Sequence, residues 1–521
     1  MELDAQKKVG KNIQKDHSGD FSYCEAQGDF TLPDYLPEIR KIIRIDATVI
    51  PSGRFIGSGK AELAGSVAYN LIYSDAEGKL SATSLSSDYE LSIPLPTEHG
   101  DLSLSVDSTA ENTQCRLSGP RKLSLRTTVK NRIHIYSNSP VTEIIDDELY
   151  CVETLTLPVF SMFTKCSSSG EFSLCDTLSL DGYTNDSVRA NYSTADIAVR
   201  EARITQDGVV CRGEVIVKCN ISPILAGEPF TLTKKIPFEQ IVTENTNGME
   251  NCIAYGRCTY LRCTLAPVED HAELEIELGA ELEVECIKNT AVSMVSDAYS
   301  TEYNSDAVYK TETFLQFIGS SMGNYTVDSS RKLTQDEENI ISIIDTKGKA
   351  EIKSVTEKSG KAVVSGECKI EVLTSSKKSD GEGVEYGNSE IVFPFKLETD
   401  LRTPDAHTDY DTHATVIMTR ARLDGDSISA DAEIFLSLKA SKKEQYRLLD
   451  SIRFDAEEKR PKMKGKVTVA YVEDGDTLFS LAKKYGVDYR TLAKENGIPE
   501  TFTAAPDEKS TLDGVRHLII T

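Results

Sequence analysis

Long stretches of this chain alternate polar and apolar residues with a period of two, and this pattern constrains the fold more than any other feature. The runs Glu273–Leu278 and Glu281–Glu285 place a glutamate at every second position. Because successive side chains of a β-strand point to opposite faces, such a run describes a strand with one buried face and one wet face. Similar runs recur before residue 455. We therefore predict a mainly β fold for this part of the chain.

A weak internal repeat divides the strand-rich region into units. Each unit holds a pair of glycines: Gly59 and Gly65, Gly208 and Gly213, Gly360 and Gly366. The second glycines recur about every 150 residues, a period that indicates tandem domains and not a solenoid. The first glycine of each pair predicts a hairpin turn, and the second predicts a bulge or a close backbone approach inside the next strand.

The repeat and the changes in composition predict how the chain is divided. A length of 521 residues fits several domains. The predicted segments are a disordered N-terminus (1–24), three β-rich, sandwich-like domains (25–150, 151–325 and 326–456), a charged linker (457–466) and a small α+β C-terminal module (467–521).

The charge balance narrows the range of partners and compartments. The chain has 83 acidic and 58 basic residues and a formal net charge of −25, which disfavours nucleic acids and anionic membrane surfaces. The polar start of the chain is followed by no apolar run, so we expect a cytoplasmic protein without a secretory signal or a membrane span.

The cysteines favour a structural interpretation. Nine of the twelve lie between Cys151 and Cys286, and none forms a C-x-x-C pair. Histidine is scarce, so a zinc site has little support. In a reducing cytosol we expect small buried thiols. Oxidative cross-linking, as in a durable protein shell, is the alternative.

No pattern in the sequence indicates catalysis. The most suggestive segment, His407 to His413, carries two histidines and two aspartates at alternate positions. Alternate residues of a strand lie about 7 Å apart, too far for all four side chains to reach one ion without a turn. Nucleophile-elbow, zincin and cysteine-protease signatures are missing from the sequence. We predict a non-enzymatic protein with no catalytic residues, metal ligands or cofactor.

The last fifty residues predict a strand, two short helices and a return strand. Asp476 or Thr477 can cap the first helix, whose apolar stripe contains Leu478 and Leu481. Gly486 fits a left-handed C-terminal position, and Asp488 can cap a second helix that stops at Asn496 and Gly497. This segment resembles a LysM module, a small βααβ binding domain.

The LysM resemblance implies a groove for N-acetylated glycans between the loop before the first helix and the loop after the second. The groove residues carried over, together with two aromatic residues expected to be exposed, are Gly475, Asp476, Thr477, Tyr489, Gly497, Ile498, Pro499 and Phe502. The second loop is about half a dozen residues longer than the usual LysM pattern, and this insertion could cap the groove or make it a protein-binding surface.

Three β-rich repeats followed by a LysM module resemble the SPOCS-plus-LysM family of spore-coat proteins, the SipL-like proteins. The opening Leu36-Pro-Glu-Ile39 and the glycine pairs carry the resemblance in the repeats. It implies a coat assembly protein, made in the mother cell and recruited to the forespore surface, whose LysM module docks on a SpoIVA-like coat ATPase and which contacts other coat proteins. The alternative is a protein of the spore cortex or envelope that binds peptidoglycan.

Overall fold

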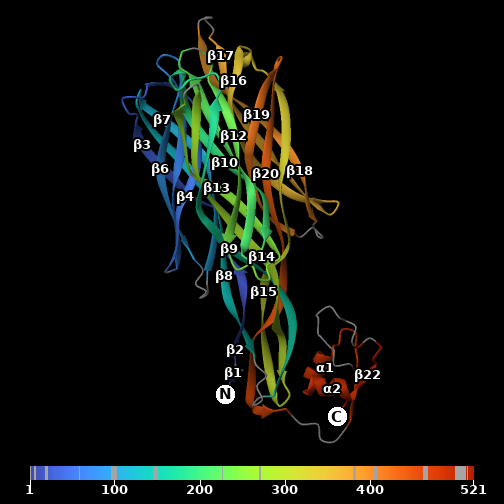
Figure 1. The fold of residues 1–521 in the computed structure, drawn as a ribbon. Helices are drawn as coiled ribbons and strands as arrows, with labels where there is room; N and C mark the ends of the chain where they lie inside the picture. Colours follow the sequence, from blue (N-terminus) through green and yellow to red (C-terminus); the bar gives the residue numbers. More distant parts are fainter. Residues whose placement is uncertain are drawn as a thin grey trace.

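The computed structural model of the protein is mainly β, with two short helices near the C-terminus, as predicted (Figure 1). It describes residues 2–4, 7–17, 21–57, 59–95, 102–144, 151–225, 227–268, 271–378, 383–402, 408–460, 467–498, 512 and 514–521.

Three consecutive units of strands make up most of the described chain. The first unit contains β3 (Ser22–Thr31), β4 (Ile39–Gly57), β5 (Lys60–Asp75), β6 (Leu80–Pro94), β7 (Leu102–Gly119) and β8 (Lys122–Ile144). The second contains β9 (Val152–Leu180), η1 (Asn185–Ser187), β10 (Val188–Ile204), β11 (Gly208–Pro223), β12 (Phe230–Thr243), β13 (Asn251–Pro267) and β14 (Ala272–Ser300). The third contains β15 (Tyr303–Lys332), η2 (Gln335–Glu337), β16 (Ile340–Lys358), β17 (Lys361–Lys377), β18 (Val384–Arg402), β19 (Thr408–Asp424) and β20 (Ser427–Lys459).

All three units have the same topology. The second, third and fourth strands form an antiparallel meander, namely β4-β5-β6, β10-β11-β12 and β16-β17-β18. The last strand of each unit lies between the first and the fifth in a second sheet: β3-β8-β7, β9-β14-β13 and β15-β20-β19. These central strands β8, β14 and β20 contain the alternating runs of the sequence, and their apolar residues fill the cores between the two sheets.

The unit boundaries differ from the predicted ones at one place in particular. The predicted boundary near 325 falls inside β15, which pairs with β20 along nearly its whole length. This continuous pairing assigns Tyr303–Lys332 to the third unit. The predicted linker also begins inside β20, which runs to Lys459, and residues 461–466 lie outside the described part of the chain.

The glycine pairs have the structural role that the sequence predicts. Gly59 and Gly360 have φ of 81° and 77° in the turns before β5 and β17. The second glycine of each pair lies opposite a register shift, where a Cβ would overlap a backbone carbonyl of the preceding strand: Ile50 for Gly65, Ala198 for Gly213 and Glu351 for Gly366. An aromatic ring of the next strand covers each glycine.

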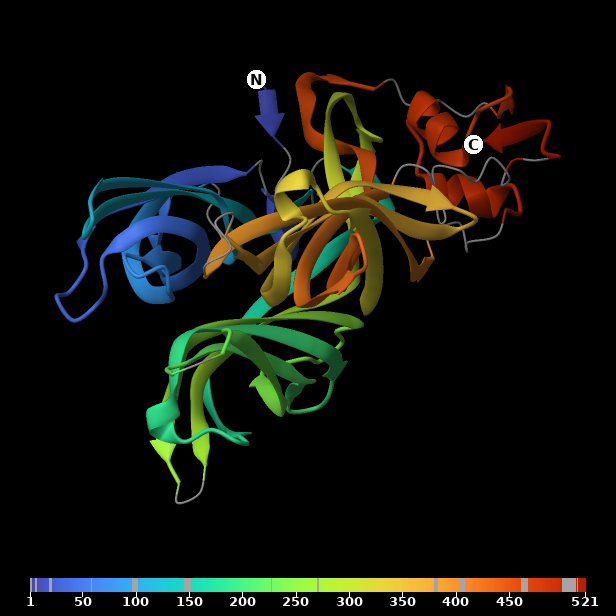
Figure 2. The same cartoon turned by 90° about the horizontal axis from the view of Figure 1, so that it is seen from above.

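The three units lie side by side, as the view from above shows (Figure 2). Equivalent positions of the three units meet at their junction. Arg44, Tyr192 and Asp345 each follow a register shift in the first meander strand of their unit. The Arg44 guanidinium pairs with the Asp345 carboxylate, and the Tyr192 hydroxyl donates to the same carboxylate at 2.8 Å.

Two further groups of side chains from different units meet at the junction. Asp107 and His413 form an ion pair at 2.8 Å, and the Tyr255 ring lies with its centroid 5.2 Å from that of His413. Lys439 Nζ lies 2.8 Å from Glu285 Oε2, and these two side chains are only 6% and 4% exposed. Removing one partner of this buried pair leaves an uncompensated charge, so Lys439 and Glu285 fix how the second and third units fit together.

A stalk extends below the sandwiches (Figure 1). It consists of the lower halves of β9, β14, β15 and β20 with β8, β1 (Glu2–Asp4) and β2 (Lys7–Asp16). β2 pairs with β8, β1 pairs with β20, and Ile13 is buried among stalk residues such as Leu157 and Phe314. The structure thus differs from the prediction that residues 1–24 are disordered, because these strands gain their order from distant partners.

Candidate functional site

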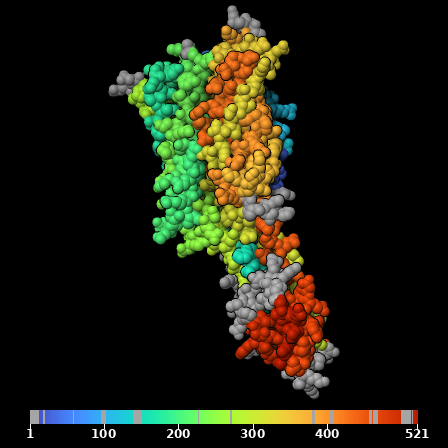
Figure 3. Space-filling model, turned by 90° about the vertical axis from the view of Figure 1, so that its right-hand side faces the viewer, coloured from blue at the N-terminus to red at the C-terminus, as the bar shows by residue number. Residues whose placement is uncertain are grey.

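The C-terminal module forms a separate lobe at the lower end of the stalk (Figure 3). Its strands β21 (Thr468–Tyr471) and β22 (His517–Ile520) pair antiparallel, and its helices are α1 (Leu478–Tyr485) and α2 (Tyr489–Glu495). Apolar residues of both helices and both strands form its small core. The order strand, helix, helix, strand is the one predicted.

The first helix begins and ends where the sequence predicts. Thr477 is the N-cap, because its side chain accepts a hydrogen bond from Ser480 N at 3.0 Å. Asp476, the other predicted cap, instead accepts from Glu473 N at 2.9 Å and so closes the preceding turn. Gly486 ends the helix with φ of 68°, a left-handed conformation that favours glycine.

The second helix is tied to the return strand by Asn496, a contact that the sequence did not predict. Asp488 caps α2 by accepting from Thr491 N, as predicted. At the other end, the Asn496 side chain donates to Ile519 O at 2.8 Å and accepts from Ile519 N at 2.7 Å. Asn496 therefore fixes the loop after α2 against β22. Its place directly before Gly497 is the only sequence signal for this role.

The two predicted groove loops rest on one core. Gly475 is exposed with φ of 95°, Gly497 is exposed with φ of 66°, and both lie in turns beside the helices. Ile498 is buried in the same cluster as Leu478, so the residues that anchor the two loops pack together. The predicted contacts Pro499 and Phe502 lie outside the described residues.

Tyr489, the remaining predicted groove residue that the structure describes, is half-buried beside the stalk contact. Its ring packs at 5.6 Å on the ring of Phe479, which in turn meets the ring of Tyr299 from the stalk at 5.0 Å in an edge arrangement. Tyr299 is completely buried, and its hydroxyl donates to Val487 O at 2.7 Å. The stalk thus supplies one side chain to the core of the module.

Charged groups complete the docking of the module on the stalk. Lys483 Nζ lies 2.6 Å from Asp297 Oδ1 and 3.1 Å from the Tyr309 hydroxyl. Burial alone would lower the pKa of Lys483, but its hydrogen bonds to Asp297 and Tyr309 raise it, so the lysine is charged at neutral pH. Arg460 Nη1 donates to Lys483 O at 3.0 Å. These contacts between the stalk and the C-terminal module involve α1 and the turn between α1 and α2.

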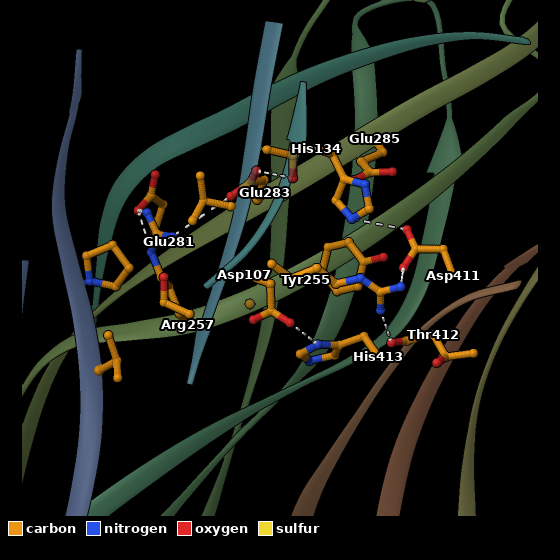
Figure 4. Close-up of a pocket in the computed structure, with 17 residues that line it drawn as sticks. Asp107, His134, Tyr255, Arg257, Glu281, Glu283, Glu285, Asp411, Thr412 and His413 are labelled. Carbon is orange, nitrogen blue, oxygen red and sulfur yellow. Dashed lines mark hydrogen bonds and ion pairs between the residues drawn. The ribbon is translucent and has the colours of Figure 1, made fainter. Parts of the chain in front are cut away.

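A cavity of about 130 Å³, lined by many charged residues, lies at the junction of the three units (Figure 4). Its wall includes Asp107, Tyr255, Glu283, Asp411 and His413. Most of its charged groups already have protein partners. His413 pairs with Asp107, Asp411 with Arg132 at 2.9 Å, and Glu283 with Arg54. The charged residues of the cavity wall therefore link the units through ion pairs.

The three described members of the alternating segment, Asp409, Asp411 and His413, each pair with a different set of partners. Asp409 pairs with Lys443 at 2.7 Å, Asp411 with Arg132 and Lys439, and His413 with Asp107; His407 lies outside the described residues. Among the residues that the structure describes, no three His, Cys, Asp or Glu side chains are placed to hold a metal ion.

A family model of the LysM domain matches residues 471–502. The C-terminal module contains a LysM domain. The match covers β21's last residue, both helices and the loops beside them, including the predicted groove residues Gly475 and Gly497. No curated protein and no solved structure matches the chain. The resemblance of residues 25–455 to spore-coat repeats stays a prediction.

None of the described helices has the length and apolar composition that a membrane-spanning helix needs. Both LysM helices are short, and each has one buried and one exposed face.

Proposed function

We propose that this protein binds N-acetylated glycans such as peptidoglycan through its LysM domain, and that the three β units are a non-catalytic carrier. The proposal rests on the position of the contact surface between the stalk and the LysM domain. The stalk covers Phe479 and Val487 of the LysM domain, whereas Gly475, Thr477 and Gly497 of the groove loops are exposed.

The chemistry of the loops suits a neutral sugar chain. Turns with glycine at Gly475 and Gly497 bring backbone amides close to a ligand without a Cβ between them. Ile498 and Leu478 supply an apolar floor below the loops. The net charge of −25 opposes polyanions but exerts no such force on an uncharged N-acetylglucosamine chain.

Co-sedimentation tests this function. The full chain is mixed with purified insoluble peptidoglycan and, in parallel, with cellulose, a glucose polymer without N-acetyl groups. We expect saturable retention on peptidoglycan, competition by soluble N-acetylglucosamine oligomers and no retention on cellulose. Equal retention on both polymers, or none on either, would contradict the proposal.

A second candidate function is the assembly of a spore coat. The three β units followed by a LysM domain motivate it, because this is the architecture of the spore-coat family that the sequence resembles. In this candidate function, the LysM domain would dock on a SpoIVA-like ATPase, and the protein would act in the mother cell at the forespore surface. The lengthened loop after Ile498 is the sequence feature that favours a protein ligand.

The two candidate functions predict different ligands for the full chain. Immobilised full chain should capture a purified SpoIVA-like ATPase if the coat candidate holds, and Phe502→Ala should weaken this capture without lowering the unfolding temperature. Truncation of an aromatic side chain at an interface hot spot costs about 2 kcal/mol or more. Retention on peptidoglycan together with no ATPase capture selects the glycan candidate.

A further inference from the structure

Two thiols face each other across the sandwich of the second unit. Cys219 lies on β11 of the meander sheet and is 1% exposed. Cys263 lies on β13 of the opposite sheet and is partly exposed. Their side chains share a hydrogen bond, and Cys263 also interacts with the side chain of Ser193 on β10. Both cysteines are free thiols that belong to the core of this unit.

The other two units lack this arrangement at the same positions. Cys219 lies six residues after Gly213, where the first unit has Leu71 after Gly65 and the third has Val372 after Gly366. Cys263 lies opposite Ile276 in the register of β13 and β14. The equivalent residue of the first unit is Cys115, opposite Leu125. The first unit thus holds one of the two thiols, and only the second unit holds both.

The two thiols differ in exposure and in acidity. The hydrogen bond from Cys219 lowers the pKa of Cys263 to about 7, although burial opposes the shift. The same hydrogen bond, together with burial, raises the pKa of Cys219. Because the thiolate is the nucleophile, the partly exposed Cys263 can react first, and the buried Cys219 is placed to react with the product. At Cys115, burial raises the pKa and no second thiol assists.

We propose that Cys263 and Cys219 form a two-thiol oxidation site, in which a peroxide oxidises Cys263 and Cys219 closes a disulfide between the two sheets. The Cys263 thiolate attacks one peroxide oxygen, the O–O bond breaks, and the products are a sulfenic acid and a hydroxide ion. The hydroxide takes up a proton from solvent, equal to the one that Cys263 lost on ionising, and becomes one water molecule. Cys219 then attacks the sulfenic sulfur. An S–S bond forms, the S–O bond breaks, and hydroxide leaves with the Cys219 proton as a second water molecule. Two thiols lose two electrons in total, and the peroxide gains them.

The disulfide would change the stability of the second unit only. It links β11 to β13 and closes a loop of the chain between Cys219 and Cys263. Closing a loop of this size restricts the unfolded chain, so oxidation should stabilise the second unit. Cys252 and Cys286 are direct cross-strand partners on β13 and β14 and are the main competing pair, but they join strands that are already hydrogen-bonded.

The test uses the full reduced chain, treated with hydrogen peroxide at pH 7, blocked with an alkylating reagent and digested with trypsin. We expect a linkage between the peptides 219–234 and 263–288, lighter by two hydrogens than their sum. Peptide 263–288 also contains Cys286, so fragmentation must assign the bond to Cys263. Before oxidation, Cys263 should alkylate about tenfold faster than Cys115, because its larger thiolate fraction outweighs its lower intrinsic nucleophilicity.

Two variants separate the roles of the thiols. Cys263→Ser should abolish the linkage, and Cys219→Ala should leave a sulfenic acid on Cys263 that a 1,3-dione reagent traps. Circular dichroism of both reduced variants checks that they fold. A Cys252–Cys286 bond as the sole product, or alkylation of Cys263 no faster than that of Cys115, would overturn the proposal.

Discussion

At the scale of single residues, the repeat is built on three glycines that no other residue can replace without strain. Gly65, Gly213 and Gly366 each sit between a backbone carbonyl and an aromatic ring. The register shift on the neighbouring strand brings that carbonyl close. The glycine thus permits a bulge in the first meander strand.

Gly366→Ala should destabilise the third unit by about 1–3 kcal/mol, because the added Cβ overlaps Glu351 O and the ring of Phe395. Urea unfolding followed by circular dichroism measures the change. Gly387→Ala is the matched control, since its Cβ would meet only the Thr374 hydroxyl at 3.5 Å. An equal effect of both substitutions would show that the close approach at Gly366 is not the cause.

The ion pair of His413 and Asp107 predicts a pH dependence. Burial would lower the pKa of His413, but Asp107 raises it above 6.5, and Arg132 and Asp411 are the other charges that face the pair. The pair therefore stabilises the junction fully below pH 6.5 and less as the pH rises through the raised pKa of His413. The stability difference between the native protein and His413→Gln should shrink over this rise. A difference that stays constant with pH would contradict the assignment of charge to His413.

At the scale of elements, the strands were predictable where the hydrophobic pattern is local. The alternating runs correspond to β8, β14 and β20, and the glycine pairs mark the hairpins before β5, β11 and β17. In the LysM domain the caps Thr477 and Asp488 and the terminator Gly486 were also predictable. Each of these signals acts within a few residues.

Features that depend on distant partners could not be predicted. β2 is polar and becomes a strand by pairing with β8, more than a hundred residues away. The meeting of Arg44, Tyr192 and Asp345 becomes visible only when the three repeats are aligned at their register shifts. Tyr299 is an ordinary strand residue in the sequence, yet its ring completes the core of another domain.

Tyr299→Ala should release the LysM domain from the stalk. The side chain is fully buried against Phe479, and loss of a large buried aromatic costs about 3–5 kcal/mol. Hydrogen exchange of the full chain should become faster in α1 and α2 but not in β11. Tyr299→Phe keeps the ring and removes the hydrogen bond to Val487, so its effect should be near 1 kcal/mol. Unchanged exchange in Tyr299→Ala would show that the dock contributes little.

At the scale of the whole molecule, ion pairs join the three units, and contacts with the stalk fix the LysM domain to them. Lys439 of the third unit reaches Glu285 of the second, and His413 of the third reaches Asp107 of the first. The stalk carries the LysM domain at its lower end, away from the sandwiches (Figure 1). The three units and the stalk can thus hold the LysM domain in a defined orientation relative to the sandwiches.

Lys439→Met should weaken the junction by about 3–5 kcal/mol, because Glu285 is left buried without its partner. Combining it with Glu285→Leu should restore most of this loss, since an apolar pair needs no compensation. Thermal unfolding of the single and double variants measures both effects. A double variant that is less stable than Lys439→Met would contradict the proposed pairing.

The most direct test of the proposed function is calorimetric titration of the full chain with soluble N-acetylglucosamine oligomers. The native protein should bind saturably. Asp474→Trp, which places a bulky side chain on the exposed loop beside Gly475, should weaken binding at least about tenfold, or 1.4 kcal/mol. Lys484→Trp, on an exposed position of α1, adds the same side chain away from the loops and should bind like the native protein. Absence of binding by the native protein, or equal binding by all three, would contradict glycan recognition by the groove.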